Sequence, residues 1–277
     1  MYMDNSNLYI SQPYSNGSID NVNISYIHTA LDIIEKNSNG LVKKRSEIGG
    51  GIRLYSIGDD EDKPIILVVG GVHGDEKSSV LGVVYSMNTI AEKNNTTFSR
   101  LLQNYSLYFV PCLNISGFNN TTRENNNGVD LNRDFGDFTQ EETKVLHQLI
   151  TSNKSRIKII LDSHNCGRDD DYYPFSFVAP EGCKNYDLYE DVSLKLRLYF
   201  QIKKPQYVDL ITIPSPNKNT LSEYINRNGF IGHTLETVRT IEPTGDQKNY
   251  KSGIENTKDL LLNTMLIYGN VQRNHII

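Results

Sequence analysis

Short apolar runs recur along the chain and predict the strands of a single sheet. Residues 65–69 read Ile-Ile-Leu-Val-Val and end at two glycines, and residues 107–110, 157–161 and 230–235 are similar runs. A weaker alternation over 52–57 predicts one more strand. Apolar runs without polar alternation are typical of parallel strands that are covered on both faces. We therefore expect a mostly parallel sheet with helices on both sides.

Apolar residues at helical spacing fill the segments between these runs. They predict helices over 26–34, 79–90, 139–150, 186–200, 220–228 and 254–268. Thr139 and Glu142 have the spacing of a capping box at the start of the third of these helices. Strand and helix patterns alternate without repeats or a linker. We therefore predict an α/β fold in one domain over residues 21–277, with a mixed, mostly parallel twisted β-sheet flanked by helices. The polar residues 1–20 predict a flexible N-terminal arm.

Three long segments lack a clear period and are rich in polar residues. They cover residues 114–132, 166–184 and 201–219. We interpret them as loops, and polar loops of this length inside a compact domain are often functional.

Ionisable side chains follow the predicted core strands. His73 and Glu76 come after the run at 65–69, His164 follows the run at 157–161, and Glu236 follows the run at 230–235. Parallel strands bring their carboxyl ends to one crevice, where ligands usually bind. Two histidines and one glutamate around an open position form a ligand set of catalytic zinc, which lowers the pKa of a bound water to about 7. Glu236 would then act as general base.

Each of these residues also has an ordinary structural interpretation. A His-x-x-Glu pair such as His73 and Glu76 is usually part of a turn, and His164 alone is more typical of a hydrogen-bonded core histidine. Glu236 alone could pair with Arg239 in a salt bridge. Only the placement of all four at strand ends favours a metal site.

Composition and charge exclude several classes of partner. The 277 residues carry a net charge of -5, which argues against nucleic-acid binding. Three cysteines do not make a disulfide framework. We see neither a signal peptide nor an apolar stretch that could span a membrane, so we expect a cytoplasmic protein without membrane attachment. The sequence is silent on the oligomeric state.

Four motifs occur in one order along the chain. They are Gly-Gly-Val-His-Gly-Asp-Glu at 70–76, Gly-Val-Asp-Leu-Asn-Arg at 128–133, Leu-Asp-Ser-His at 161–164 and Thr-Leu-Glu at 234–236. Together they resemble the motifs of the M14 metallocarboxypeptidases, the zinc carboxypeptidases, and the resemblance extends over about residues 24–268. It implies the fold of that family and one Zn²⁺ per chain. It also implies that His73, Glu76 and His164 bind the zinc, with Glu236 as catalytic base.

The resemblance assigns further roles to the polar loop at 114–132 and the residue after it. Asn132 and Arg133 would hold the free carboxylate of the substrate, because a guanidinium pairs with a carboxylate through two hydrogen bonds. Arg123 would polarise the scissile carbonyl and stabilise the oxyanion. Asp130 would orient a ligand histidine from outside the ligand set.

The chain also departs from the pattern of the family. Many members have a tyrosine in the loop about twenty residues before the base, but residues 212–217 contain none, and Tyr207 and Tyr224 flank that stretch without matching it. Leu221 lies near the position that often sets side-chain specificity, which weakly favours an uncharged pocket. Cys166 could bind a metal, although a buried thiol without a metal is the better interpretation.

This machinery predicts hydrolysis of an amide bond next to a free carboxylate. The bond cleaved would be that of the C-terminal residue of a peptide, a class that includes short cell-wall-type peptides. The alternative is an N-acyl amino acid, as in the related aspartoacylase and succinylglutamate desuccinylase group. The 41 residues after Glu236 leave no room for the C-terminal β domain of those deacylases, which favours a peptidase. An inactive binding protein with the same fold is a remote third possibility.

Overall fold

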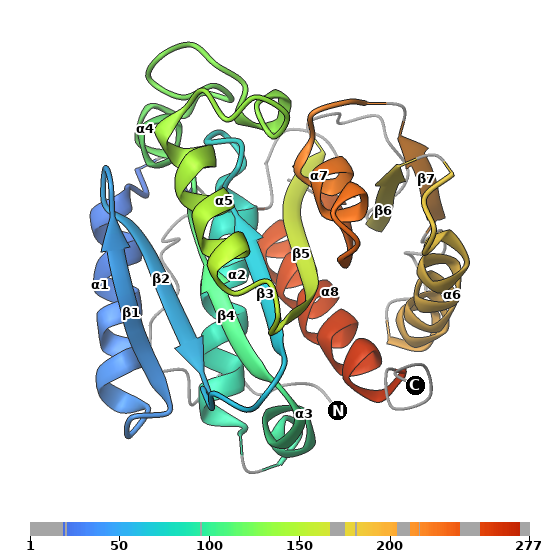
Figure 1. Ribbon diagram of the computed structural model, residues 1–277. Helices are drawn as coiled ribbons and strands as arrows, with labels where there is room; N and C mark the ends of the chain where they lie inside the picture. The colour runs from blue at the N-terminus through green and yellow to red at the C-terminus, as the bar shows by residue number, and fades with distance from the viewer. Residues whose placement is uncertain are drawn as a thin grey trace.

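The structure is a computed structural model that describes residues 19, 21–94, 96–166, 175–180, 182–203, 211–215, 217–238 and 250–271 (Figure 1). The described strands form one eight-stranded sheet in the order β1-β2-β4-β3-β5-β8-β6-β7. Their bounds are β1 Val42–Ile48, β2 Ile52–Ile57, β3 Ile65–Gly70, β4 Ser106–Val110, β5 Ile157–Cys166, β6 Phe175–Pro180, β7 Ile211–Ser215 and β8 Ile231–Val238. The sheet is mixed, as expected from the sequence. The pairs β3–β4, β3–β5, β5–β8 and β6–β7 are parallel, and the pairs β1–β2, β2–β4 and β6–β8 are antiparallel.

Helices cover both faces of this sheet. Their bounds are α1 Ile24–Asn37, α2 Lys77–Glu92, α3 Ser99–Asn104, α4 Ile115–Asn120, α5 Glu141–Ser152, α6 Tyr186–Lys203, α7 Leu221–Arg227 and α8 Tyr250–Val271. Figure 1 shows α5 and α7 in front of the sheet, and α1, α2 and α8 behind it. Among the described residues, no helix has the combined length and apolar character that a bilayer crossing requires.

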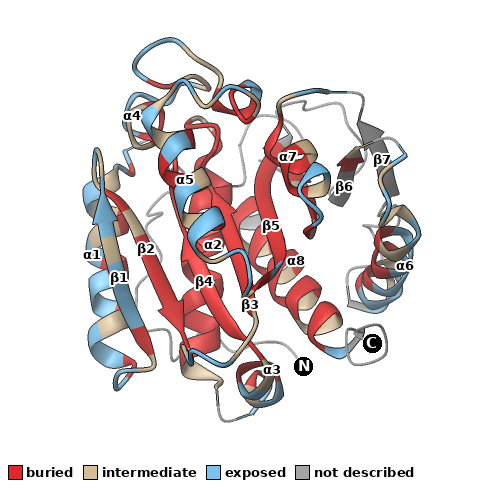
Figure 2. Ribbon diagram, in the orientation of Figure 1, coloured by how far each residue is buried: buried red, intermediate tan, exposed pale blue. Residues whose placement is uncertain are grey.

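The central strands are buried because both of their faces pack against helices. In β3, Ile66 and Val68 belong to the core shared with α1, α2 and α8, whereas Ile65, Leu67 and Val69 belong to the core shared with α5 and α7. Successive side chains of a strand point to opposite faces, so a strand between two layers must be apolar throughout. Figure 2 shows this contrast, with β3 buried along its length and β1 largely exposed at the edge.

The strand order brings the candidate residues together. β5 lies between β3 and β8, and all three run parallel. In the register of β5 and β8, His164 lies opposite Glu236. Both residues lie within their strands, since β5 continues to Cys166 and β8 to Val238, whereas the sequence pattern predicted that the strands end before them.

Several elements lie where the sequence predicted loops. α4 occupies part of 114–132, β6 part of 166–184 and β7 part of 201–219. Of the arm predicted over 1–20, only Ile19 is described, and its side chain packs into the core. Elements as short as α4, β6 and β7 contain too few residues for a periodic pattern to stand out.

The predicted capping box at Thr139 is wrong. α5 begins at Glu141 and its N-cap residue is Gln140, whose side chain makes no capping hydrogen bond. The carboxylate of Asp134 takes this place, because it accepts hydrogen bonds from the backbone N–H groups of Thr139 and Gln140 at 2.9 Å each. It also accepts the hydroxyl groups of Thr139 and Thr143. Asp134 therefore anchors the two residues that precede α5.

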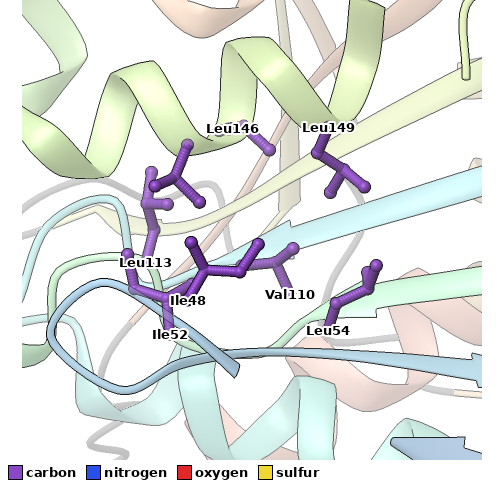
Figure 3. Close-up of a pocket in the computed structure, with 8 residues that line it drawn as sticks. Ile48, Ile52, Leu54, Val110, Leu113, Leu146 and Leu149 are labelled. Carbon is purple, nitrogen blue, oxygen red and sulfur yellow. The ribbon is translucent and has the colours of Figure 1, made fainter. Parts of the chain in front are cut away.

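A shallow apolar hollow lies between the β1–β2 hairpin and α5 (Figure 3). Its lining is aliphatic throughout and includes Ile48, Leu54 and Leu149. None of the candidate ligands lines it, and it offers no polar group that could orient a substrate.

The buried His233 should make the free energy of unfolding sensitive to acid. Its side chain is fully buried on β8, and burial lowers its pKa to about 3. The unfolded chain takes up this proton near pH 6.5, so unfolding is coupled to proton uptake between about pH 6.5 and 3. The free energy of unfolding should therefore fall as the pH is lowered through this range. We expect His233→Gln to reduce the loss between pH 7 and pH 5 by about 2 kcal/mol.

Denaturant unfolding of the metal-free protein at the two pH values measures this effect. Tyr268→Phe is the matched control, because it removes the hydroxyl that lies 3.1 Å from Nδ1 of His233 but keeps the imidazole. This control should keep the acid sensitivity of the wild type. Equal pH dependence in wild type and His233→Gln would contradict the prediction.

Candidate metal centre and active site

The loop from β3 to α2 carries His73 and Glu76, and two glycines shape it. Gly71 has a φ of +63°, a conformation that favours glycine. Gly74 packs against the backbone of Gly117, where an added Cβ would lie 2.0 Å from the carbonyl carbon. The tight path brings the side chains of His73 and Glu76 together in a buried position.

Three side chains converge at one point, two from the β3–α2 loop and one from strand β5. Nδ1 of His73 lies 2.8 Å from Oε1 of Glu76, and Nδ1 of His164 lies 2.9 Å from Oε2. The two Nδ1 atoms are 3.1 Å apart. In a tetrahedral zinc site with bonds of about 2.0–2.1 Å, the ligand atoms lie about 3.3 Å from one another. The distances between these three donor atoms are therefore close to those between the ligand atoms of a single bound Zn²⁺.

The outer nitrogen of each histidine faces a carboxylate. Nε2 of His73 lies 3.2 Å from Oδ1 of Asp130, and Nε2 of His164 lies 3.0 Å from Oδ1 of Asp162. An ionised carboxylate can only accept, so the hydrogen bond between His73 and Asp130 places a proton on Nε2 of His73. Nε2 of His164 and Oδ1 of Asp162 are within ion-pair distance but do not have the geometry of a hydrogen bond. The Nδ1 atom of each histidine faces the Glu76 carboxylate. In a neutral imidazole that is protonated on Nε2, Nδ1 presents a lone pair, and in an imidazolium it presents a second proton. Carboxylate partners of this kind orient the histidines of metal sites.

The pKa values show that the cluster requires positive charge. Burial alone would lower the pKa of His164, but Asp162 and Glu76 outweigh it and raise that pKa well above its usual value. The same balance, with Glu76 and Asp130 as partners, raises the pKa of His73. Burial would raise the pKa of Glu76, but the two histidines hold it well below its usual range. Two protons or one divalent cation would neutralise the cluster equally well.

The donor set therefore fits zinc. It combines two imidazole nitrogens with one carboxylate, which as three ligands leave the fourth position of a tetrahedral site to another group, and it has carboxylates behind both histidines. In the described part of the chain, His73, Glu76 and His164 are the one group with this geometry.

Glu236 lies beside the cluster, opposite His164 across the β5–β8 pair. Its Oε2 is buried and makes no hydrogen bond within the described residues. Burial raises the pKa of Glu236 to about 7, and the nearby Glu76 raises it as well, whereas the two histidines lower it. A carboxyl group with a pKa near neutrality is suited to accepting and returning a proton. Arg239, the alternative partner, lies outside the described residues.

Arg123 reaches the cluster from the loop after α4. Its Nε and NH2 atoms donate to Oδ2 of Asp130 at 3.0 and 2.9 Å, and its NH1 lies 3.3 Å from Nδ1 of His73. Asp130 therefore holds both a histidine and an arginine, and one face of the guanidinium group is directed at the cluster.

Asn132 and Arg133 lie in a single 3₁₀ turn, Leu131–Arg133, directly after Asp130. Oδ1 of Asn132 accepts the N–H of Leu221 at the start of α7. This contact orients the amide and leaves its N–H groups to donate to a ligand. Arg133 is exposed, and its NH1 donates to the carbonyl oxygen of Asn132.

Other candidates lie elsewhere. Tyr224 is buried, and its hydroxyl lies 2.8 Å from Nδ1 of His147, so it does not replace the family's loop tyrosine. The side chain of Leu221 is fully buried in the core below α7. Tyr207 and the side chain of Cys166 lie outside the described residues.

Asp162 belongs to the motif at 161–164, where no role was predicted for it. It is fully buried, and its Oδ2 accepts the hydroxyl of Thr234 on β8. Residues two apart on a strand share a face, so a carboxylate two positions before His164 was a usable signal.

The comparisons with known proteins agree with this geometry. The family model described as zinc carboxypeptidase matches residues 32–227. The chain belongs to the zinc carboxypeptidase family. The matched region includes His73, Glu76, His164 and the loop with the arginines, but it ends before Glu236.

Curated relatives match shorter stretches. Carboxypeptidase SOL1 of Arabidopsis thaliana is 32% identical over 126 residues, which are 38% of this chain and 25% of that protein. Carboxypeptidase B of Helicoverpa zea is 24% identical over 147 residues, 39% of this chain and 34% of that protein. The chain thus spans about a quarter to a third of the length of these relatives.

Solved structures resemble this one over nearly the whole chain. Carboxypeptidase A from Helicoverpa armigera has a TM-score of 0.74 at 16% identity, covering 94% of this chain and 78% of that chain. Bovine thrombin-activatable fibrinolysis inhibitor, in complex with tick carboxypeptidase inhibitor, has a TM-score of 0.71 at 16% identity, covering 91% and 98%. At this identity the likeness establishes the zinc carboxypeptidase fold.

Asp162 provides a test of the metal centre. We expect Asp162→Asn to weaken zinc binding by about 10- to 100-fold, because the ligand His164 loses the carboxylate that orients it. Competition with a chromophoric chelator at constant pH measures the zinc dissociation constant. Asp134→Asn is the matched control, since Asp134 is another buried carboxylate but caps α5 and contacts no candidate ligand. Zinc binding by Asp162→Asn within threefold of the wild type would contradict this role.

Proposed function

We propose that this zinc carboxypeptidase family member is an active, zinc-dependent metallocarboxypeptidase that removes the C-terminal residue of a peptide. The observation that carries the proposal is the convergence of His73, Glu76 and His164 on one point, with Glu236 opposite His164. Zinc bound there would polarise a carbonyl group and make water nucleophilic near neutral pH.

Glu236 moves the proton in this proposal. Its buried Oε2 accepts a proton from the attacking water and delivers it to the leaving amine. The pKa of about 7 supports both halves of this transfer at neutral pH. Arg123 stabilises the negative charge that develops on the carbonyl oxygen, since Asp130 holds its guanidinium group in place before the substrate arrives.

The 3₁₀ turn after Asp130 selects the substrate. The guanidinium group of Arg133 and the amide N–H groups of Asn132 bind the terminal carboxylate of the peptide. The exposure of Arg133 allows this contact, and the hydrogen bond from Leu221 fixes the orientation of the Asn132 amide. The substrate is thus placed by its carboxylate, with the neighbouring amide bond at the metal centre.

An N-acyl amino acid deacylase would use the same groups, so it remains the second candidate. The named curated relatives and structural neighbours are mainly carboxypeptidases, which favours a peptide substrate. A screen of blocked dipeptides, short peptides with D-amino acids or diaminopimelate, and N-acetyl and N-succinyl amino acids separates the two classes. Turnover of the acyl amino acids alone would reject the peptidase proposal.

The role of Glu236 predicts a specific kinetic effect. We expect Glu236→Gln to lower kcat by about 10²- to 10⁴-fold, because the amide cannot accept the proton, while zinc binding is retained. Steady-state kinetics on a blocked dipeptide, together with elemental analysis for zinc, measures both. A zinc-loaded variant with wild-type kcat would reject this mechanism and leave a binding protein as the better interpretation.

The role of Arg133 predicts a loss of selectivity. We expect Arg133→Ala to lower kcat/KM for a peptide with a free C-terminus by about 10- to 100-fold, the equivalent of one charge-assisted contact. The corresponding peptide amide, which is already a poor substrate, should be affected much less. Comparing kcat/KM for the two substrates tests this, with the exposed Arg227→Ala as control, since Arg227 pairs with Glu223 on α7. Equal losses for acid and amide would exclude a carboxylate contact.

A further inference from the structure

The first turn of α2 has an unusual arrangement of hydrogen bonds. Glu76 is the N-cap residue of this helix, but its side chain makes no capping hydrogen bond. Its two carboxylate oxygens are instead directed at His73, His164 and the backbone N–H of Asn165, which lies 2.9 Å from Oε2. An N-cap side chain usually accepts the N–H of the second or third helical residue. The Glu76 side chain therefore does not cap α2, although Glu76 is the N-cap residue.

The side chain of Asn165, on strand β5, makes the capping hydrogen bond instead. Its Oδ1 accepts the N–H of Ser79, the third residue of α2, at 2.6 Å. The same N–H also donates to the carbonyl oxygen of Glu76 at 3.0 Å, so it is shared between two acceptors. Asn165 directly follows the candidate ligand His164 on β5 and is fully enclosed by the fold.

Two threonines hold the Asn165 amide in this orientation. Its Nδ2 donates to Oγ1 of Thr237 on β8 at 2.6 Å and lies 3.3 Å from Oγ1 of Thr257 on α8. The two threonine hydroxyls are 2.7 Å apart. Asn165 thus links α2, β5, β8 and α8 directly behind the metal centre.

We propose that Asn165 is a positioning residue that caps α2 in place of Glu76 and so keeps the Glu76 carboxylate at the two histidines. The inference rests on the zinc site of the proposed function. A buried N–H requires an acceptor. Without the Asn165 side chain, the Ser79 N–H keeps only its longer hydrogen bond, to the Glu76 carbonyl oxygen. The Glu76 carboxylate, on the N-cap residue, is then the side chain placed to supply a second acceptor, as N-cap side chains do. If the Glu76 carboxylate turned toward the Ser79 N–H, the metal site would lose one of its three ligands.

The zinc dissociation constant of Asn165→Ala tests this directly. We expect a 10- to 100-fold weaker affinity, the range known for residues that orient metal ligands. Asn226→Ala is the matched control. Asn226 also links three elements, by donating to the carbonyl oxygens of Ser222 and Gly232 and accepting the hydroxyl of Tyr189, and it contacts no candidate ligand. The control should bind zinc within threefold of the wild type.

Two further measurements exclude a merely structural role. In a crystal structure of metal-free Asn165→Ala, we expect the Glu76 carboxylate at the Ser79 N–H. Asn165→Asp keeps the accepting oxygen and the volume of the side chain, and it should retain zinc affinity within threefold.

The proposal is overturned if Asn165→Ala binds zinc like the wild type, if both alanine variants weaken binding equally, or if Glu76 stays at the histidines. A tenfold loss of affinity in Asn165→Asp would overturn it as well, and this variant decides the question if Asn165→Ala does not fold. Chelator competition needs no peptide, so a wild type that binds zinc but cleaves nothing would refute the proposed function without affecting this inference.

Discussion

The contact between the Glu76 carboxylate and the two histidines is the constraint on which the rest of the site depends. A carboxylate in a fully buried position is stable only with positive charge beside it. His73 and His164 supply that charge as imidazolium groups, or they share the carboxylate with a cation as neutral ligands. The outer carboxylates, Asp130 and Asp162, increase the demand for positive charge, and Asp130 also holds the His73 ring through a hydrogen bond.

The sheet makes this concentration of charge possible. β3 and its exit loop deliver His73 and Glu76, and the adjacent parallel strands β5 and β8 deliver His164 and Glu236 in register. Two apolar layers on either side of these strands keep the backbone rigid and exclude water from behind the site. The polar loop after α4 closes over the same edge, and its Asp130 connects the arginine to the histidine.

Polar side chains outside the metal-ligand set hold several of these parts together. Asp134 binds the backbone directly before α5, Asn132 is tied to the start of α7, and Asn165 joins α2 to the two strands behind the metal centre. In each case a side chain from one element satisfies backbone groups at the end of another. Such contacts couple the positions of loops that would otherwise be set only by their own short sequences.

The sequence by itself determined the parts of the protein that depend on local patterns. The apolar run before Gly70 predicted β3, helical spacing predicted α1 and α8, and the residues at the strand exits identified the metal candidates. The tertiary structure alone decided that β5 lies between β3 and β8, that Asp162 faces His164, and that Asp134 replaces Thr139 as the cap of α5. The physical reason is that periodicity reports how one element is buried, whereas neighbours in space depend on packing between segments far apart along the chain.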